Sequence, residues 1–114
     1  MPDKNIKTNA KEKKILDIKN QIQQIKRELQ TIGEMRPGSL TCQYHFPKEK
    51  KGAFYQLSYT RNMKGHTDYV RREFVNDLKL QIKNYKRFRT LTKRWVDLAM
   101  KYSKLKIASA IKKG

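Results

Sequence analysis

The sequence has few acidic residues for its size. Only 10 Asp and Glu stand against 28 Lys and Arg in 114 residues, so the formal net charge is +18. A chain with this imbalance repels cationic surfaces and attracts polyanions. We therefore expect a nucleic acid as the partner, although charge alone does not say which kind.

Cysteine and long apolar runs are also scarce. The single cysteine, Cys42, excludes an intrachain disulfide framework and is typical of a reducing compartment, so we expect a cytoplasmic protein. No run approaches the roughly 20 apolar residues of a membrane span, and no apolar segment near the N-terminus resembles a secretory signal. We therefore expect no membrane partner.

Motifs for catalysis or cofactor binding are absent from the sequence. It contains no Gly-rich phosphate loop, no H-E-x-x-H and no G-x-S-x-G. Two-metal nuclease chemistry needs several convergent carboxylates, whereas the acidic residues here are scattered. Cys42 and His45 have the spacing of half a zinc site, but the other half is missing. We expect no enzyme activity, no metal and no cofactor.

An N-terminal helix is indicated by apolar residues that recur every three or four positions. This isoleucine seam consists of Ile15, Ile18, Ile22, Ile25, Leu29 and Ile32. Asn9 can cap such a helix with Glu12 three residues on, and Gly33 suits a left-handed helix end. We expect residues 1–8 to be a flexible N-terminus and residues 9–34 to form a coiled-coil-like helix.

A β-hairpin is predicted after this helix. Residues 53–60 are rich in strand formers, residues 61–65 supply a loop with Asn and Gly, and residues 66–70 form the return strand. Tyr55 and Tyr59 share one face of the first strand. We expect them to pack on the helices, and stacking on unpaired bases is the alternative.

From about Arg72 the helical period returns and continues to about Ser109. The predicted fold class is α+β, mainly α, in which residues 35–114 form one domain together with the first helix. Because the first helix is shorter than the second, part of the second helix's apolar face would stay exposed, and we expect self-association to cover it. The predicted oligomerisation residues are Ile15, Ile18, Ile22, Ile25, Leu29, Ile32, Trp95 and Tyr102.

More than half of the excess positive charge lies on the predicted long helix. Residues 72–114 carry 13 basic and 3 acidic side chains. A helix that is basic on one side can contact phosphates with that side, and a merely solvated lysine face is the alternative. The hairpin tip offers a second basic surface. The predicted nucleic-acid-binding residues are Arg61, Lys64, Arg71, Arg72, Lys79, Lys83, Lys86, Arg87, Lys93 and Arg94.

Four short segments carry a family resemblance, which covers about residues 35–107. They are Met35-Arg36-Pro37-Gly38-Ser39-Leu40, Gly52-Ala53-Phe54-Tyr55-Gln56-Leu57-Ser58-Tyr59-Thr60, Tyr69-Val70 and Asn84-Tyr85-Lys86-Arg87-Phe88-Arg89. The chain resembles a family of small basic prokaryotic proteins that are often found beside, or fused to, transposases of mobile elements. This resemblance implies a role with mobile-element or phage DNA and supplies no biochemical activity.

Three functions fit these observations. The first is a non-enzymatic nucleic-acid-binding protein, with DNA favoured over RNA, that is accessory to a mobile element or phage. The second is a coiled-coil interaction or adaptor subunit, either as a homo-oligomer or in complex with a DNA-processing enzyme such as a transposase or nuclease. The third is an RNA-binding protein, because small Lys-rich chains with tyrosines are common among these proteins.

Overall fold

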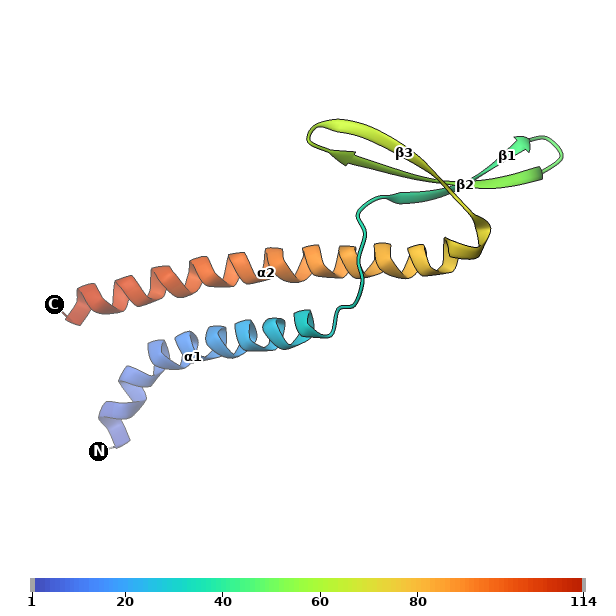
Figure 1. Ribbon diagram of the computed structural model, residues 1–114. Coiled ribbons are helices and arrows are strands. Elements are labelled where there is room, and N and C mark those ends of the chain that lie inside the picture. Colours follow the sequence, from blue (N-terminus) through green and yellow to red (C-terminus); the bar gives the residue numbers. More distant parts are fainter. Residues whose placement is uncertain (1, 114) are drawn as a thin grey trace. The chain divides into compact units, whose positions relative to one another are not determined.

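The computed structural model describes the backbone of residues 2–113 and the side chains of residues 10–111. In chain order the elements are α1 (Pro2–Gln30), β1 (Ser39–Phe46), β2 (Lys51–Arg61), β3 (Lys64–Val70), a 3-10 turn (Arg72–Phe74) and α2 (Val75–Lys113) (Figure 1). The predicted fold class, α+β and mainly α with an N-terminal helix and a long C-terminal helix, is confirmed.

The chain divides into two compact units. The helical unit contains α1 and Thr31 together with α2 from Arg89 onward, and the sheet unit consists of Ile32–Phe88. Helix α2 therefore contributes its first turns to the sheet unit and its remaining turns to the helical unit.

Helix α1 begins and ends earlier than the sequence predicts. It starts at Pro2, so the prediction that Asn9 caps it is wrong, because Asn9 lies inside the helix. Proline suits a first helical position, where its missing N–H would have no partner in the helix. At the other end the Thr31 hydroxyl donates to the Glu28 carbonyl at 2.6 Å. Gly33 does not adopt a positive φ, so it does not form the predicted left-handed end.

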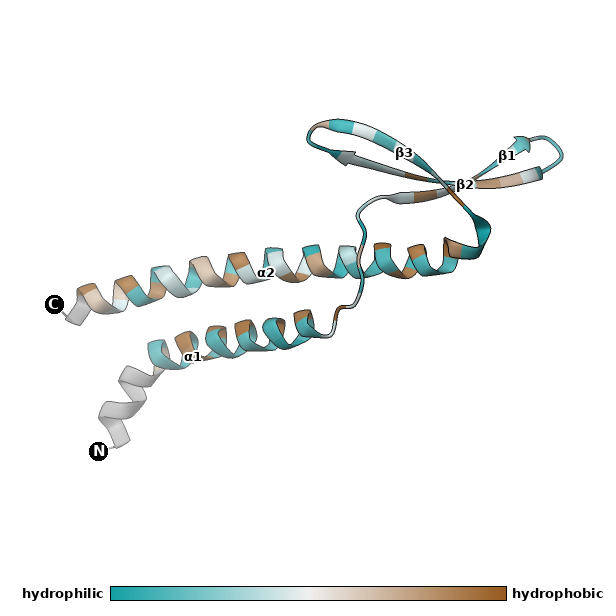
Figure 2. Ribbon diagram, viewed as in Figure 1, coloured by the Kyte–Doolittle hydropathy of each residue, from teal (hydrophilic) through white to brown (hydrophobic). Residues whose placement is uncertain are grey.

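The core of the helical unit comes from residues two turns apart on each helix. Ile18 and Ile25 of α1 are buried, as are Leu91 and Leu98 of α2. A seven-residue spacing keeps each pair on one face of its helix. Hydrophobic residues recur along both helices at this kind of interval (Figure 2). The two helices run antiparallel in this unit (Figure 1).

Two of the predicted oligomerisation residues are buried within a single chain, and the others are only half-buried. Ile18 and Ile25 are buried, whereas Ile15, Ile22, Leu29, Ile32, Trp95 and Tyr102 are half-buried. The Lys26 ammonium lies over the Trp95 ring, 5.3 Å from its centroid, and forms a cation–π interaction with it. Burial of the two isoleucines therefore needs no second subunit, and self-association stays a prediction.

The sheet has three antiparallel strands in the order β1-β2-β3, so the predicted hairpin gains a strand that the sequence analysis missed. In β1 only Leu40 packs against the core, and most other side chains of the strand are exposed. The alternation of Leu40, Cys42, Tyr44 and Phe46 with polar residues is nevertheless visible in the sequence and is the signal that could have indicated this strand. Its pairing with β2 places Leu40 opposite Leu57.

The turn between β2 and β3 is tighter than predicted. Arg61 pairs with Lys64, which leaves a two-residue loop of Asn62 and Met63 in place of the predicted loop over residues 61–65. Both loop residues have a positive φ, 53° and 64°, as a type I′ turn requires. Asn62 fits this conformation, whereas Met63 occupies a position where glycine is usual.

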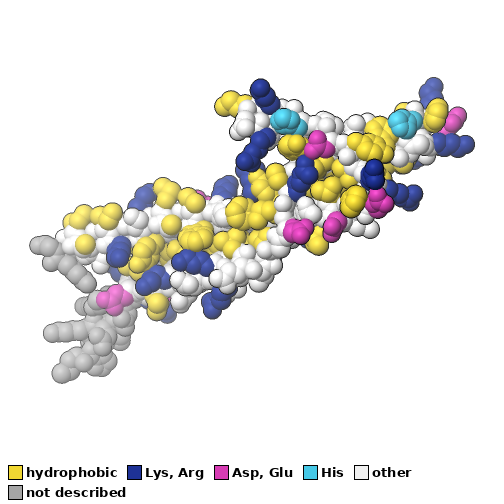
Figure 3. Space-filling view, viewed as in Figure 1, with side chains coloured by type: hydrophobic (Ala, Val, Ile, Leu, Met, Phe, Trp, Pro, Cys, Tyr) yellow, Lys and Arg dark blue, Asp and Glu magenta, His cyan; other side chains and the backbone are white. Residues whose placement is uncertain are grey.

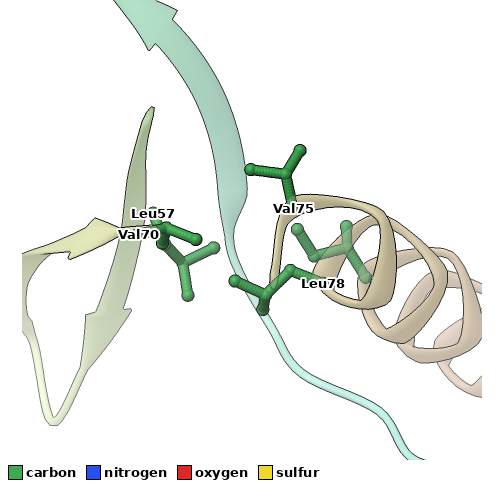
Figure 4. Packing of buried hydrophobic residues seen from close by; sticks show 5 residues of the cluster. Leu57, Val70, Val75 and Leu78 are labelled. Atoms are coloured by element: carbon green, nitrogen blue, oxygen red, sulfur yellow. The ribbon is translucent and has the colours of Figure 1, made fainter. Parts of the chain in front are cut away.

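The sheet packs one face against the start of α2. Leu57 is fully buried, and it forms the core with Val70, Val75, Leu78 and Ile82 (Figure 4). Leu40, Tyr55 and Tyr59 are half-buried and pack against this cluster. Both tyrosines therefore pack against the core, and their packing on the helices stays a prediction.

The segment between α1 and β1 is attached to the sheet unit by side chains and backbone. The Asn84 side-chain amide donates to the Glu34 backbone carbonyl at 2.8 Å, and the Arg36 N–H donates to the Gln81 carbonyl at 3.0 Å. The Arg36 guanidinium also lies 3.0 Å from the Asp68 carboxylate and 5.2 Å from the centroid of the Tyr59 ring. These contacts fix where the chain enters β1.

Gly38 completes this entry to the sheet. Its φ is 135°, and a Cβ there would lie 2.9 Å from Leu57 Cδ1 and 3.0 Å from the Ser58 carbonyl oxygen. The chain can pass this close to β2 only without a side chain.

Candidate nucleic-acid interface

Three lysines of α2 line one groove in the sheet unit. Lys79, Lys83 and Lys86 are spaced by four and three residues, so they share one side of the helix. The opposite wall is the chain at the start of β1, Gly38–Leu40, and Ile82 lies between the walls. The volume of this lysine groove is about 350 Å³. Because Ile82 is also part of the core, the turn that carries the lysines is fixed in place.

The charge of the lysine groove is not neutralised by neighbouring acids. None of its three lysines forms an ion pair within the part of the chain that the structure describes. The Asp68 carboxylate pairs with Arg36, and the Glu34 carboxylate accepts a hydrogen bond from the Gln81 side chain at 3.3 Å. A concave surface with three exposed ammonium groups concentrates positive potential, which attracts phosphates.

The wall of the groove opposite the lysines is uncharged. Ser39 contributes to this wall, and its register opposite Ser58 places its side chain on the face of the sheet away from the core. The close approach of Gly38 to β2 sets how far this wall stands from the lysines. The three lysines thus face an uncharged wall.

The other predicted binding residues lie elsewhere, and all ten predicted residues are exposed. Arg61 and Lys64 flank the turn between β2 and β3. Arg71 lies 3.9 Å from the Glu73 carboxylate, which partly offsets its charge, and Arg72 begins the 3-10 turn. Lysine and arginine side chains are scattered over the visible face, with acidic side chains among them (Figure 3).

Helix α2 carries the remaining three predicted residues. Lys93 lines a hollow of about 390 Å³ in the helical unit together with Arg89 and Val96. Arg87 and Arg94 are seven residues apart, so they share a side of the helix next to the one that carries the groove lysines. The structure therefore brings together Lys79, Lys83 and Lys86, and it does not bring the other seven to them.

A row of aromatic side chains that the sequence did not predict lies on the outer face of the sheet, opposite the core. The rings of His45 and Phe54 stack with centroids 4.5 Å apart, and those of Phe54 and Tyr69 stack at 6.4 Å. The three residues come from β1, β2 and β3 in turn. Alternation along β2 predicts that Phe54 points away from Tyr55, but only the register of all three strands reveals its neighbours.

Cys42 and His45 do not converge on a common site. They are three residues apart in β1, so their side chains lie on opposite faces of the strand. Within the described residues, no three His, Cys, Asp or Glu side chains form a group that could hold a metal ion. Cys42 is exposed, and its hydrogen bond with Tyr44 raises the pKa of the tyrosine hydroxyl above its ordinary value.

Neither α1 nor α2, over the residues described, has a stretch apolar enough to cross a membrane.

Comparison with known proteins identifies the family to which the chain belongs. No curated protein and no solved structure matches the chain. One family model matches residues 15–80, which run from the isoleucine seam through the three strands to the first turns of α2. The chain belongs to this family, whose description is a domain of unknown function, DUF6788.

Proposed function

We propose that the protein is a non-enzymatic nucleic-acid-binding protein whose lysine groove contacts phosphates. The observation that carries the proposal is the set of three lysines that line one groove and form no ion pair within the described residues. The net charge of +18 supports the same conclusion, because it favours any polyanion over a neutral or cationic partner. The resemblance to proteins found beside transposases favours the nucleic acid of a mobile element or phage.

The test compares two triple variants with equal net charge. The groove variant is Lys79→Gln/Lys83→Gln/Lys86→Gln, and the control is Lys14→Gln/Lys101→Gln/Lys104→Gln, whose lysines are exposed and lie in the helical unit. If each groove lysine neutralises one phosphate, the slope of log affinity against log salt falls by about 3 in the groove variant. Affinity at near-physiological salt falls about tenfold or more, and the control changes much less.

Equal losses in the two variants would contradict the groove assignment, because they would show that total charge alone governs binding. Circular dichroism of each variant checks that the fold is retained. No binding of the wild-type chain to any nucleic acid would contradict the proposed function as a whole.

A second candidate function, protein interaction, is favoured by an apolar stripe on α2. Val96, Met100, Ile107 and Ile111 are exposed and spaced by four, seven and four residues, so they share one side of the helix. Sedimentation of the wild type and of Met100→Lys/Ile107→Lys tests this candidate. We expect a wild-type oligomer that the variant abolishes. A wild type that stays monomeric at high concentration, and recovers no transposase or nuclease when mixed with one, would contradict it.

A further inference from the structure

We propose that the outer face of the sheet binds unpaired nucleobases, so that the preferred partner is a single-stranded nucleic acid. This inference rests on the proposed function and goes beyond it, because phosphates alone do not distinguish single strands from duplexes. The observation behind it is the aromatic row of His45, Phe54 and Tyr69.

The aromatic row is ordered and accessible. Its rings are near-parallel, with interplanar angles of 28° and 21°. Tyr69 nevertheless keeps 69% of its surface exposed, and His45 is exposed as well. Cross-strand pairing accounts for the contacts between the rings but leaves the ends of the row open to solvent. An open stack of rings is a surface on which a base can continue the stack.

Gly52 holds a position that lets His45 join the row. The φ of Gly52 is 69°, and a Cβ there would lie 3.0 Å from His45 Cβ and 3.2 Å from Cδ2. The imidazole thus lies over a residue without a side chain and reaches Phe54. A larger residue at this position would displace the ring from the stack.

The rest of the outer face suits base edges and does not suit a charged partner. By alternation and register this face carries no Asp, Glu, Lys or Arg in any of the three strands, although a third of the chain is charged. Its polar side chains are hydroxyls and amides, namely Ser39, Thr41, Gln43, Gln56, Ser58, Thr60 and Thr67. Amide and hydroxyl groups donate to and accept from base edges.

Basic side chains lie near both ends of the aromatic row, at the His45 end together with one acidic residue. Beside His45 is a hollow of about 420 Å³, which is also lined by Phe46, Pro47, Lys48 and Glu49. A base in this hollow can stack on the ring face of His45 that Phe54 leaves free, and Lys48 is then close to its phosphate. Beyond Tyr69 the chain continues through Val70 into two exposed arginines, Arg71 and Arg72. Aromatic platforms combined with flanking cations are typical of single-strand binding.

The experiment uses the full chain and three probes of one sequence: a single-stranded DNA, the matching RNA and the DNA duplex. Each single strand carries one 2-aminopurine, whose fluorescence falls when it stacks. We expect at least tenfold tighter binding to a single strand than to the duplex. The DNA and RNA arms show which sugar is preferred.

The diagnostic variant is His45→Ala/Tyr69→Ala, which changes only exposed side chains, and its control is Phe74→Ala, an exposed aromatic outside the sheet. We expect the diagnostic variant to lose at least tenfold in single-strand affinity and to lose the quenching, with the salt slope and duplex affinity unchanged. The control matches the wild type.

The outcomes separate this inference from the proposed function. If the wild type binds the duplex as tightly as single strands and the diagnostic variant binds both normally, the stacking inference is overturned while nucleic-acid binding stands. If no probe binds, both are overturned. A loss of affinity for all three probes in Phe74→Ala as well would indicate a general structural effect and would also overturn the assignment to the aromatic row.

Discussion

Asn84 of α2 holds the chain that leads into the sheet, because its side-chain amide donates to the backbone carbonyl of Glu34 at 2.8 Å. The two residues are 50 positions apart in sequence. Asn84 is the first residue of the segment Asn84–Arg89, which carries part of the family resemblance. Its contact with Glu34 is structural. The bond therefore contributes to the stability of the sheet unit.

Replacing Asn84 by alanine removes this donor. We expect Asn84→Ala to lower the free energy of unfolding by about 1 kcal/mol, since the half-buried Asn84 loses its hydrogen bond to the Glu34 carbonyl. Urea denaturation followed by circular dichroism measures the change. Asn76→Ala, an exposed residue near the start of the same helix, serves as the control and should change stability much less. A matching loss in both variants would show that the hydrogen bond contributes nothing.

Gly38 and Gly65 form a matched pair for a test of backbone strain. Gly38→Ala places a methyl group 2.9 Å from Leu57 Cδ1 at a φ of 135°, and we expect a loss of about 1–3 kcal/mol. At Gly65 a Cβ meets nothing within 4 Å, so Gly65→Ala should stay within about 0.5 kcal/mol of the wild type. The denaturation midpoints of the two variants, compared with that of the wild type, measure the two losses. A stable Gly38→Ala protein would mean that the close approach to β2 is absent.

Met63 occupies a left-handed conformation that glycine adopts without strain. We expect Met63→Gly to raise the free energy of unfolding by up to about 1 kcal/mol, because the side chain is exposed and the φ is 64°. Thermal unfolding measures the gain. Met35→Gly is the control, since Met35 has no positive φ and glycine there only increases the freedom of the unfolded chain. Stabilisation by both variants would argue against the type I′ turn.

Leu57 is the centre of the sheet core, at 0% exposure, whereas Leu80 of α2 is 57% exposed. We expect Leu57→Ala to lower the free energy of unfolding by about 2–5 kcal/mol, since it removes buried methyl groups and leaves a cavity. Leu80→Ala should cost less than about 1 kcal/mol. Chemical denaturation of both variants provides the measurement. Similar losses would mean that the sheet does not pack on α2 as described.

The sequence predicts the helices and the hairpin better than it predicts the sheet. Ile18 and Ile25 follow the helical period, so spacing alone identifies them as core. Strand β1 is absent from the prediction, although Leu40, Cys42, Tyr44 and Phe46 alternate with polar residues, which is the local pattern of a strand. The tight turn is missed because Met63, unlike glycine, gives no signal for a positive φ.

The two candidate sites can likewise be predicted only in part from the sequence. The helical spacing of Lys79, Lys83 and Lys86 is visible in the sequence, but the wall that makes them a groove comes from Gly38–Leu40 and requires the folded chain. The aromatic row depends on the register of three strands, so His45 and Tyr69 become neighbours of Phe54 only in the sheet. Long-range pairing of this kind leaves no local pattern.

The division of the chain into two units gives each unit one built-in spectroscopic reporter. The only tryptophan, Trp95, lies in the helical unit under the Lys26 ammonium, so its emission follows the packing of the two helices. The only thiol, Cys42, lies exposed in the sheet unit, where it accepts a fluorescent label without competition. Melting of the helices and melting of the sheet can thus be recorded separately in one unmutated sample, and their midpoints reveal whether the protein unfolds in one step or two.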